Sequence, residues 1–360
     1  MGIVRDLRKT VAEYLPPRVS FTRDYLIELA RRDVTISIQD ATKAFVKGFL
    51  PSSFVAYGLR DKDPMDFVPD LFYKKTIYMC GKQRILLADK LLFAFLISDL
   101  VDVPKTYCFI SQGEVSPLCQ DANLSSVSAI WEYGQECNAS FILKPVDGAK
   151  GKGVVSLRIV GDVAELDGLH LSFPEFSDYV SNLDNYVLSE QIKQDHYVSR
   201  IFPGSVNTVR IVTMIDSSTR EPFVAYAVQR IGTHKSAPTD NGSRGGIFAL
   251  VDLRTGILGR ATSYVKHSKG TVVWYESHPD TGEQISGTQI PNWSGALKTI
   301  LAAAHRLQNV PLVGWDVCVF PDRVVVIEGN VGPCLVLSQM HQPLLVDERV
   351  RKFFESYGIC

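Results

Sequence analysis

The chain has 360 residues, of which 46% are hydrophobic and 21% charged, and its 38 Lys and Arg residues nearly balance 39 Asp and Glu. This composition is that of an ordinary globular protein and excludes wholesale disorder and fibrous repeats, and the length predicts about two domains. Because the charges balance, the chain has no general positive field for nucleic acid, and we expect no nucleic-acid partner.

The hydropathy pattern predicts no transmembrane segment. The longest apolar stretch covers residues 91–98, whereas a helix that crosses a bilayer needs about 20 apolar residues. Residues 1–32 hold seven basic and four acidic side chains. They predict either a solvated helical face or peripheral contact with a membrane surface or an anionic partner. The seven cysteines are widely spaced and form no CxxC, which favours a cytoplasmic protein with reduced thiols.

Helical and strand patterns follow one another along the chain. Residues 1–75 have the apolar spacing of helices joined by loops, and further helices are predicted at 86–100, 121–136, 175–183, 294–308 and 344–357. From residue 140 onward, β-branched runs predict strands at 140–146, 153–160, 186–192, 208–215 and 222–231, and a hairpin of 317–320 with 323–328. Hairpins mixed with helices predict an α+β fold with largely antiparallel sheets.

A glycine- and lysine-rich turn joins two of these strands, in the sequence FILKPVDGAKGKGVV at 141–155. Gly148, Gly151 and Gly153 alternate with Lys150 and Lys152. Glycines let the backbone approach an anion closely, and lysines add positive charge there. A Walker A loop is excluded because a strand follows instead of a helix. The segment predicts a flap over a nucleotide triphosphate, with an exposed Gly/Lys turn as the alternative.

Lys144 lies within the apolar strand that precedes this turn. An unpaired ammonium in apolar surroundings is costly, so we expect Lys144 to meet an anion such as a phosphate. The alternative is an edge strand that leaves the ammonium in solvent.

The segment GWDVCVFPDRVVVIEGN at 314–330 predicts a metal-binding hairpin. A three-residue turn at 321–323 would place Asp316 opposite Glu328, with Asn330 two residues further on the same face. Opposed carboxylates repel each other unless a cation lies between them, and Mg²⁺ held by carboxylates and substrate phosphates is the usual arrangement. The alternative is that both carboxylates are strand-end charges in water.

These features together resemble the ATP-grasp superfamily. They comprise an Asp-Lys pair near a helix start, an apolar strand with a lysine, the Gly/Lys flap, a strand that ends in Glu, and the late Asp and Glu-x-Asn hairpin. Within the superfamily, the chain is similar to the sugar-transfer-associated ATP-grasp group, which is related to α-L-glutamate ligases. The closer similarity lies at 205–213, 239–256, 278–293 and 314–330, and the resemblance covers about residues 75–360.

The resemblance implies two α+β subdomains that clamp a nucleotide, preceded by a mostly helical N-terminal region. The implied parts are 1–75, 76–192 with the flap, and 193–360 with the metal site. The implied ATP-binding residues are Lys90, Lys144, Gly148, Lys150, Gly151, Lys152 and Gly153 for the phosphates, and Glu190, Gln191 and Lys193 near the adenine. The implied Mg²⁺ ligands are Asp316, Glu328 and Asn330.

Arg210 and Arg230 would lie beside the transferred phosphoryl group by the same resemblance. The residues alone leave two alternatives for Arg210, because an arginine between Val209 and Ile211 meets either an anionic ligand or a structural carboxylate. His234 and His278 are candidate bases, although a histidine in a polar loop is more often merely solvated.

The implied activity is that of an ATP- and Mg²⁺-dependent carboxylate–amine ligase. Such an enzyme forms an amide or related acyl bond through an acyl phosphate, here with a sugar, amino acid or peptide acceptor in surface-polysaccharide or natural-product biosynthesis. Charge neutralisation and alignment are the main physical demands of phosphoryl transfer. The alternatives are a kinase that phosphorylates a small-molecule or sugar hydroxyl, and a non-catalytic nucleotide-binding module. The sequence leaves the acceptor and the oligomeric state open.

Overall fold

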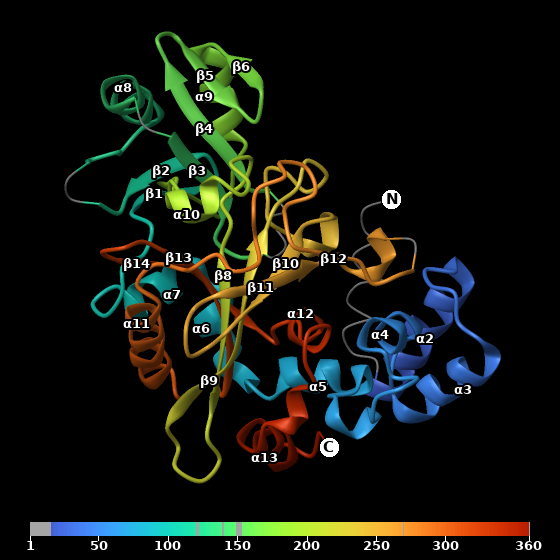
Figure 1. The fold of residues 1–360 in the computed structure, drawn as a ribbon. Coiled ribbons are helices and arrows are strands. Elements are labelled where there is room, and N and C mark those ends of the chain that lie inside the picture. Colours follow the sequence, from blue (N-terminus) through green and yellow to red (C-terminus); the bar gives the residue numbers. More distant parts are fainter. Residues whose placement is uncertain (1–15, 120–121, 139, 149–152, 269, 360) are drawn as a thin grey trace. The chain divides into compact units, whose positions relative to one another are not determined.

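The computed structural model describes residues 16–119, 122–138, 140–148, 153–268 and 270–359 (Figure 1). The chain forms two compact units. Unit 1 comprises Met1–Arg84, Asp195–Val324 and Gly329–Cys360, and unit 2 comprises Ile85–Gln194 and Val325–Glu328. The predicted division into 1–75, 76–192 and 193–360 stays a prediction.

Unit 2 is built on an antiparallel sheet with the strand order β2-β1-β7-β3-β4-β5-β6. Its strands are β1 (Thr106–Ser111), β2 (Glu114–Pro117), β3 (Ser140–Pro145), β4 (Val155–Val160), β5 (Val163–Leu166), β6 (Leu169–Leu171) and β7 (Tyr186–Glu190). Its helices are α6 (Ile85–Ala88), α7 (Lys90–Ile97), α8 (Val127–Cys137) and α9 (Phe173–Ser181).

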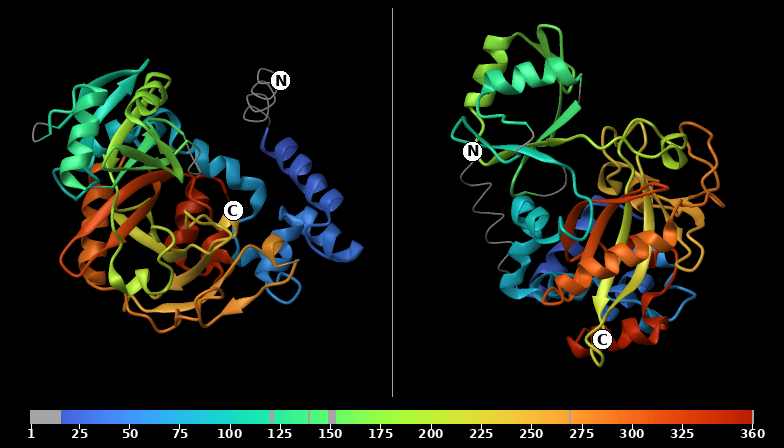
Figure 2. Two further views of the ribbon diagram at one scale, coloured as in Figure 1. Left: turned by 90° about the horizontal axis from the view of Figure 1, so that it is seen from above. Right: turned by 90° about the vertical axis from the view of Figure 1, so that its left-hand side faces the viewer.

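The core of unit 2 lies on one face of this sheet, where α8 and α9 contact β4, β5 and β6 (Figures 1 and 2). Phe141 and Leu143 of β3 belong to this core. Because successive side chains of a strand point to opposite faces, Ile142 and Lys144 lie on the other face of the sheet. β3 is an interior strand between β7 and β4, so the edge-strand alternative for Lys144 is wrong.

The first part of unit 1 is helical, as predicted for this region. It contains α2 (Pro17–Arg31), α3 (Ile38–Lys47), α4 (Pro51–Tyr57) and α5 (Tyr73–Tyr78), with short 3-10 turns at Pro64–Asp66, Asp70–Phe72 and Gly81–Arg84. Phe45 of α3 packs on Phe21 and Tyr25 of α2, with ring centroids 5.7 and 5.0 Å apart. Residues 1–15 of the predicted helical region lie outside the described residues.

The rest of unit 1 is a second sheet with the order β12-β11-β10-β9-β8-β13-β14, antiparallel from β12 to β13. The strands are β8 (Val209–Ile215), β9 (Pro222–Ile231), β10 (Ile247–Val251), β11 (Leu258–Thr262), β12 (Trp274–Tyr275), β13 (Leu312–Val319) and β14 (Val324–Val331). The helices are α10 (His196–Ser199), α11 (Trp293–Arg306), α12 (Val336–Gln339) and α13 (Glu348–Ser356), with short 3-10 turns at Gly242–Arg244, Val265–His267 and Leu344–Val346.

The two faces of this second sheet are covered differently. α11 lies across β8, β9 and β13, as the second view of Figure 2 shows. Val212 and Met214 of β8, Tyr226 and Val228 of β9, and Leu312 of β13 instead pack in one core cluster with residues of α2, α4, α12 and α13. Side chains alternate between the two faces of a strand, so residues two or four positions further along β8, β9 and β13 lie on the same face as these five, the face that α2, α4, α12 and α13 cover.

Two local details differ from the sequence prediction. The predicted helix 86–100 is interrupted at Asp89, whose backbone is extended. Asp89 is the N-cap of α7, and its carboxylate accepts a 2.9 Å hydrogen bond from the Leu92 amide. In the β13–β14 hairpin, the Phe320 amide donates to the Arg323 carbonyl at 2.9 Å. Arg323 therefore pairs with Phe320, and the predicted three-residue turn at 321–323 is wrong.

None of the described helices is long and apolar enough to cross a membrane.

The mixture of helices and largely antiparallel sheets is the predicted α+β architecture, and the prediction is confirmed.

Candidate active site

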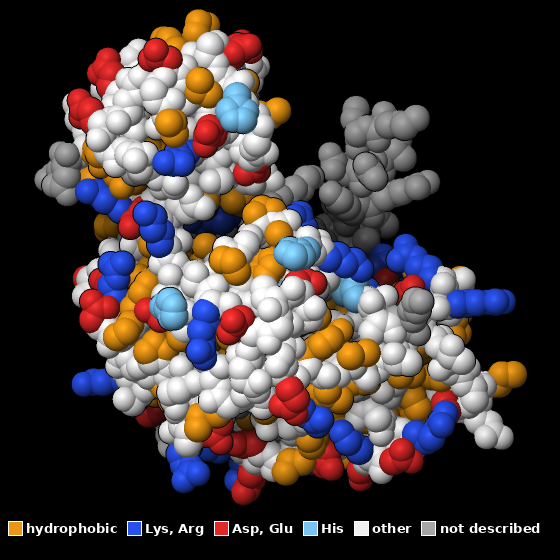
Figure 3. Space-filling view, turned by 45° about the horizontal axis from the view of Figure 1, so that its top comes forward, with side chains coloured by type: hydrophobic (Ala, Val, Ile, Leu, Met, Phe, Trp, Pro, Cys, Tyr) orange, Lys and Arg blue, Asp and Glu red, His pale blue; other side chains and the backbone are white. Residues whose placement is uncertain are grey.

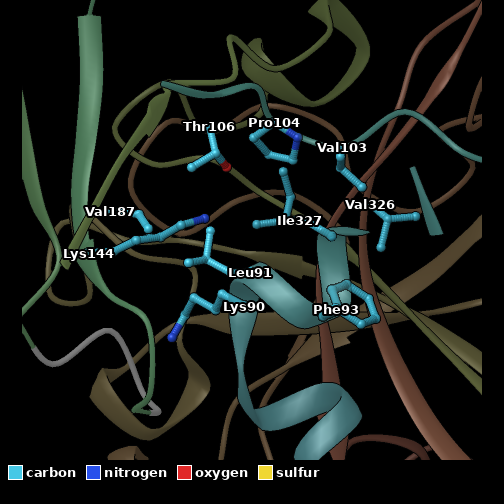
Figure 4. Close-up of a pocket in the computed structure, with 11 residues that line it drawn as sticks. Lys90, Leu91, Phe93, Val103, Pro104, Thr106, Lys144, Val187, Val326 and Ile327 are labelled. Atoms are coloured by element: carbon cyan, nitrogen blue, oxygen red, sulfur yellow. The ribbon is translucent and has the colours of Figure 1, made fainter. Parts of the chain in front are cut away.

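The face of the unit 2 sheet that lies opposite α8 and α9 holds a pocket that contains Lys144 (Figure 4). Its lining includes Lys90, Thr106, Lys144, Val187, Val326 and Ile327. In Figure 4 the ammonium of Lys144 points between Thr106 and Leu91 toward Ile327. The segment Val325–Glu328 reaches unit 2 through a 2.8 Å hydrogen bond from the Val326 amide to the Asp102 carbonyl.

Lys144 is a half-buried cation whose charge is not neutralised by a bonded partner. Among the described residues, no hydrogen bond or ion pair engages its ammonium. Burial lowers the pKa of Lys144 to about 8, Glu328 opposes this shift, and Lys90 adds to it. Such an ammonium gains free energy from an anion that enters the pocket.

Lys90, the first residue of α7, is tied to the segment that leads into the flap. Its ammonium donates to the carbonyls of Pro145, Val146 and Gly148 at 2.9, 3.3 and 3.4 Å, and its backbone amide donates to Val146. Burial lowers the pKa of Lys90, which Glu328 opposes. Lys90 thus places a second positive charge at the start of the flap.

The flap is described only at its two ends, because Lys150, Gly151 and Lys152 lie outside the described residues. Gly148 and Gly153 both have positive φ angles, of 130° and 75°. A Cβ on Gly153 would lie 2.7 Å from the hydroxyl oxygen of Tyr186 in β7. Glycine at 153 is therefore required both by the backbone conformation and by the close approach of Tyr186.

The end of β7 holds the residues predicted to meet adenine. The amide of Glu190 donates to Lys105, and the amide of Gln191 donates to Ser140, at 2.8 and 3.2 Å. Both amides are therefore used within unit 2. The side chains are engaged there as well, because Glu190 Oε2 accepts from the Lys105 amide and Gln191 Oε1 accepts from the Ser156 hydroxyl, each at 3.3 Å. Lys193 is exposed in the following loop. None of the three lines the pocket that holds Lys144.

In unit 1, Arg210 of β8 forms a bidentate ion pair with Asp316 of β13. The distances are 2.5 Å from Nε to Oδ1 and 2.9 Å from Nη2 to Oδ2, and both side chains are about 90% buried or more. The two residues are direct neighbours in the strand register. Of the alternatives for Arg210, pairing with a carboxylate is the one that this structure contains.

Arg230 of β9 extends the ion pair into a network. Its Nη1 donates to Asp316 Oδ2 at 2.7 Å, and its Nη2 donates to Asp240 Oδ1 at 2.5 Å. Burial disfavours the charged guanidinium, but Asp240 and Asp316 outweigh it and raise the pKa of Arg230 above its ordinary value. Asp240 was not among the predicted site residues, although it stands in a stretch, 239–256, that carries the family resemblance.

Asp240 is itself fixed by the chain segment before β8. Its Oδ2 accepts hydrogen bonds from the amide and the hydroxyl of Thr208, at 3.0 and 2.6 Å. Arg230 therefore bridges a carboxylate that is anchored to backbone and a second carboxylate that it shares with Arg210.

A glycine makes room for this network. A Cβ on Gly314 in β13 would lie 3.1 Å from Cδ of Arg210 and 2.8 Å from Cβ of Pro333. Gly314 is two residues before Asp316 and shares its face of the strand. The sequence signal for this role is the glycine that precedes Trp-Asp in 314–316.

The predicted metal ligands are partly brought together. Asn330 donates from Nδ2 to Asp316 Oδ2 at 3.3 Å. Glu328 belongs to the part of β14 in unit 2 and acts electrostatically on Lys144 and Lys90. Within the described part of the chain, no group of three or more His, Cys, Asp or Glu residues is placed to hold a metal.

The two candidate histidines have different surroundings. His278 is buried, stacks on Phe202 with ring centroids 5.1 Å apart, and its Nε2 lies 2.8 Å from the Gly232 carbonyl. The expectation of a merely solvated histidine is therefore wrong for His278, because loop residues cover it. His234 is 78% exposed beside Asp280.

Comparison with known proteins identifies the family. The family model described as sugar-transfer associated ATP-grasp matches residues 72–353. The chain belongs to the sugar-transfer associated ATP-grasp family. Residues 1–71, which include α2, α3 and α4, lie outside the match.

Solved structures similar to this ATP-grasp chain include three enzymes. They are N5-carboxyaminoimidazole ribonucleotide synthetase with ADP (14% identity, TM-score 0.38, 71% of this chain and 48% of that chain), an L-amino acid ligase from Bacillus licheniformis (11%, 0.35, 73% and 42%) and D-alanine–D-alanine ligase from Bacillus anthracis (12%, 0.38, 76% and 67%). The chain thus spans about half the length of the first two. No curated protein matches the chain.

Proposed function

We propose that this chain is an ATP- and Mg²⁺-dependent ligase that forms an amide or related acyl bond through an acyl phosphate. The acceptor would be a sugar, an amino acid or a peptide. The observation that carries the proposal is Lys144, a half-buried ammonium in the pocket of unit 2 that no described residue engages in a hydrogen bond or ion pair. A bound phosphate group would neutralise this positive charge.

The proposed nucleotide contacts in unit 2 follow from its geometry. Lys144 and Lys90 would hold phosphate oxygens, and the flap from Gly148 to Gly153 would cover them. The positive φ angles of both end glycines support a backbone that can approach a phosphate closely. Glu190, Gln191 and Lys193 are proposed contacts of the adenine side, by carbonyl and side-chain groups.

The chemistry of the predicted metal ligands fits Mg²⁺. Asp316, Glu328 and Asn330 supply carboxylate and amide oxygens, which are the ligands that Mg²⁺ takes together with substrate phosphates. Bound Mg²⁺ would neutralise phosphate charge during transfer. Asp316 already binds two guanidinium groups, so it would have to share its carboxylate with them or release them in order to bind Mg²⁺.

Arg210 and Arg230 are the proposed catalytic residues. Buried guanidinium groups held in fixed positions stabilise the charge that spreads over a transferred phosphoryl group. Their bidentate geometry suits an oxyanion with two or three oxygens.

Trapping by hydroxylamine tests this function directly. The chain would be incubated with ATP, Mg²⁺ and a panel of amino acids, sugar acids and peptides, and ADP, free phosphate and hydroxamate would be measured together. A ligase gives all three with one carboxylate. Phosphate that remains on a hydroxyl of the product would instead establish a kinase. Nucleotide binding without turnover on the whole panel would establish a binding module.

We also propose that the N-terminal helices contact an anionic membrane surface. Ile38 and Val46 of α3 are 88% and 74% exposed, and Leu26 of α2 is 58% exposed. Exposed basic side chains stand nearby on the same helices, namely Arg18, Arg31, Lys43 and Lys47. Figure 3 shows blue and orange side chains close together at the right-hand end of the molecule, where Figure 1 places α2 and α3. Exposed apolar and basic groups together suit the interface of an anionic bilayer.

A further inference from the structure

The two arginines and two aspartates of unit 1 form a set whose formal charges cancel. Arg210 and Arg230 share Asp316, and Arg230 alone also binds Asp240. The four side chains are 4% to 15% exposed. As long as Asp316 holds both guanidinium groups, these arginines offer little net positive charge to a further anion.

The two aspartates differ in what holds them. Asp240 is anchored by the amide and hydroxyl of Thr208 and binds only Arg230 of the pair. Asp316 is the residue that both arginines share, and it is also the predicted metal ligand. Loss of Asp316 as a partner would leave Arg230 held by Asp240, while Arg210 would lose its bidentate carboxylate.

We infer that Asp316 keeps an oxyanion site closed, and that the site opens when a cation takes over this carboxylate. The inference rests on the proposed function, because it uses the proposed metal role of Asp316. In the open form, Arg210 binds an oxyanion of the reaction, such as the transferred phosphoryl group, in place of the Asp316 carboxylate. Asp240 is a positioning residue that keeps Arg230 in place in both forms. Cation binding and oxyanion binding therefore strengthen each other.

The sharpest test needs no metal and no nucleotide. In Asp316→Asn the shared negative charge is gone, so Arg210 loses its bidentate carboxylate and can bind an anion in buffer with EDTA, while Arg230 stays paired with Asp240. We expect this variant to bind sulfate about tenfold or more tightly than the unmodified protein, the usual scale of such coupling. Calorimetry measures the affinity, and sulfate-dependent thermal stabilisation is an independent readout.

Asp240→Asn is the matched control. It removes one buried negative charge from the same network but leaves Asp316 bound to both arginines, so sulfate affinity should change little. The double variant Asp316→Asn with Arg210→Gln should lose the gain. Equal gains in both single variants would show a general effect of charge and overturn the inference, and so would the absence of a gain in Asp316→Asn.

A measurement on the unmodified protein covers the case that Asp316→Asn does not fold. The Nε–H signal of Arg210 would be followed by ¹⁵N NMR, after assignment with Arg210→Lys. We expect it to move when Mg²⁺ is added with a non-hydrolysable ATP analogue, but not with the analogue in EDTA, while the Arg230 signal keeps its position. Mg²⁺-dependent binding of the analogue with an unmoved Arg210 signal would overturn the inference and leave the proposed function standing. Absence of nucleotide binding would instead contradict the proposed function, and with it the inference that rests on that function.

Discussion

Arg210 and Asp316 stand 106 positions apart in the chain, yet they face each other across β8 and β13 as direct register neighbours joined by two hydrogen bonds. A bidentate arginine–carboxylate pair fixes the orientation of both side chains. The position of the guanidinium that we propose to act on phosphate is thus set by the sheet itself.

Gly314→Ala should impair this arrangement without unfolding the protein. The added Cβ would press on Cδ of Arg210 and on Pro333, so Arg210 must shift, and misplacement of a catalytic group by about 1 Å can cost 100-fold in rate. We expect a comparable fall in ATP turnover. Gly259→Ala in β11 is the control, because its Cβ would meet only ordinary contact at 3.5 Å. Similar activity of the two variants would refute the role of Gly314.

Glu328→Gln should abolish ATP turnover while the fold is kept. The amide retains the size of the side chain but removes the charge that would bind Mg²⁺ and that acts on Lys144 and Lys90. Phosphate release at saturating Mg²⁺ measures the effect, and circular dichroism checks the fold. Turnover at the unmodified rate would refute the metal assignment.

ATP binding should depend on pH through Lys144. Burial lowers its pKa to about 8 in the free protein, so the ammonium is charged below this value and neutral above it. Because a phosphate favours the charged form, affinity should fall as pH rises through 8, and binding near pH 8.5 should take up protons. Calorimetry in buffers of different ionisation enthalpy measures this uptake. Lys144→Met should bind ATP more weakly and without the uptake, and an unchanged uptake would exclude Lys144 as its source.

Asp70 should make the N-terminal helices more stable at mildly acidic pH. Burial raises its pKa from 3.8 to about 7, despite hydrogen bonds from the Leu50 amide and the Ser53 hydroxyl. Between pH 4 and 7 the folded state therefore binds more protons than the unfolded state, and stability falls as pH rises through this range. Thermal unfolding from pH 5 to 8 measures the fall. Asp70→Asn should flatten it, and an identical slope in the variant would assign it to other groups.

Vesicle binding should depend on the exposed face of α3. The chain should sediment with vesicles that contain anionic lipid and remain in solution with neutral vesicles, and high salt should weaken the binding. Val46→Ser, which removes a side chain that is 74% exposed, should reduce binding without loss of stability. Equal sedimentation with neutral and anionic vesicles would contradict the charge contribution.

The sequence predicts those parts of the fold whose pattern is local. β8, β9 and the β13–β14 hairpin follow from long β-branched runs, and α11 from its apolar spacing. β10 was not predicted, because a short strand that is buried on both faces lacks a period that separates it from helix. The break between α6 and α7 was also missed, because the capping hydrogen bond of Asp89 outweighs a continuous apolar run.

The contacts of the candidate site also divide into those that a local sequence pattern predicts and those that depend on the order of strands in the sheet. Asp316 and Asn330 belong to one hairpin, so the sequence predicts that they lie near each other, although the turn at 321–323 from which their shared face was predicted is not formed. The pairing of Arg210 with Asp316 depends on β8 being the neighbour of β13, and strand order in a sheet is not visible in local patterns. Asp240 was missed for the same reason, since its partners Thr208 and Arg230 come from two other segments.

The buried network also constrains how the central sheet can assemble. A slip of β13 by a single residue would turn Asp316 toward α11 and leave two guanidinium groups in the interior without a shared acceptor. An uncompensated buried charge of this kind costs about 3–5 kcal/mol. The same side chains that we assign to chemistry would thus penalise wrong alignments during folding, so mutations chosen to probe catalysis here should also lower the yield of correctly paired strands.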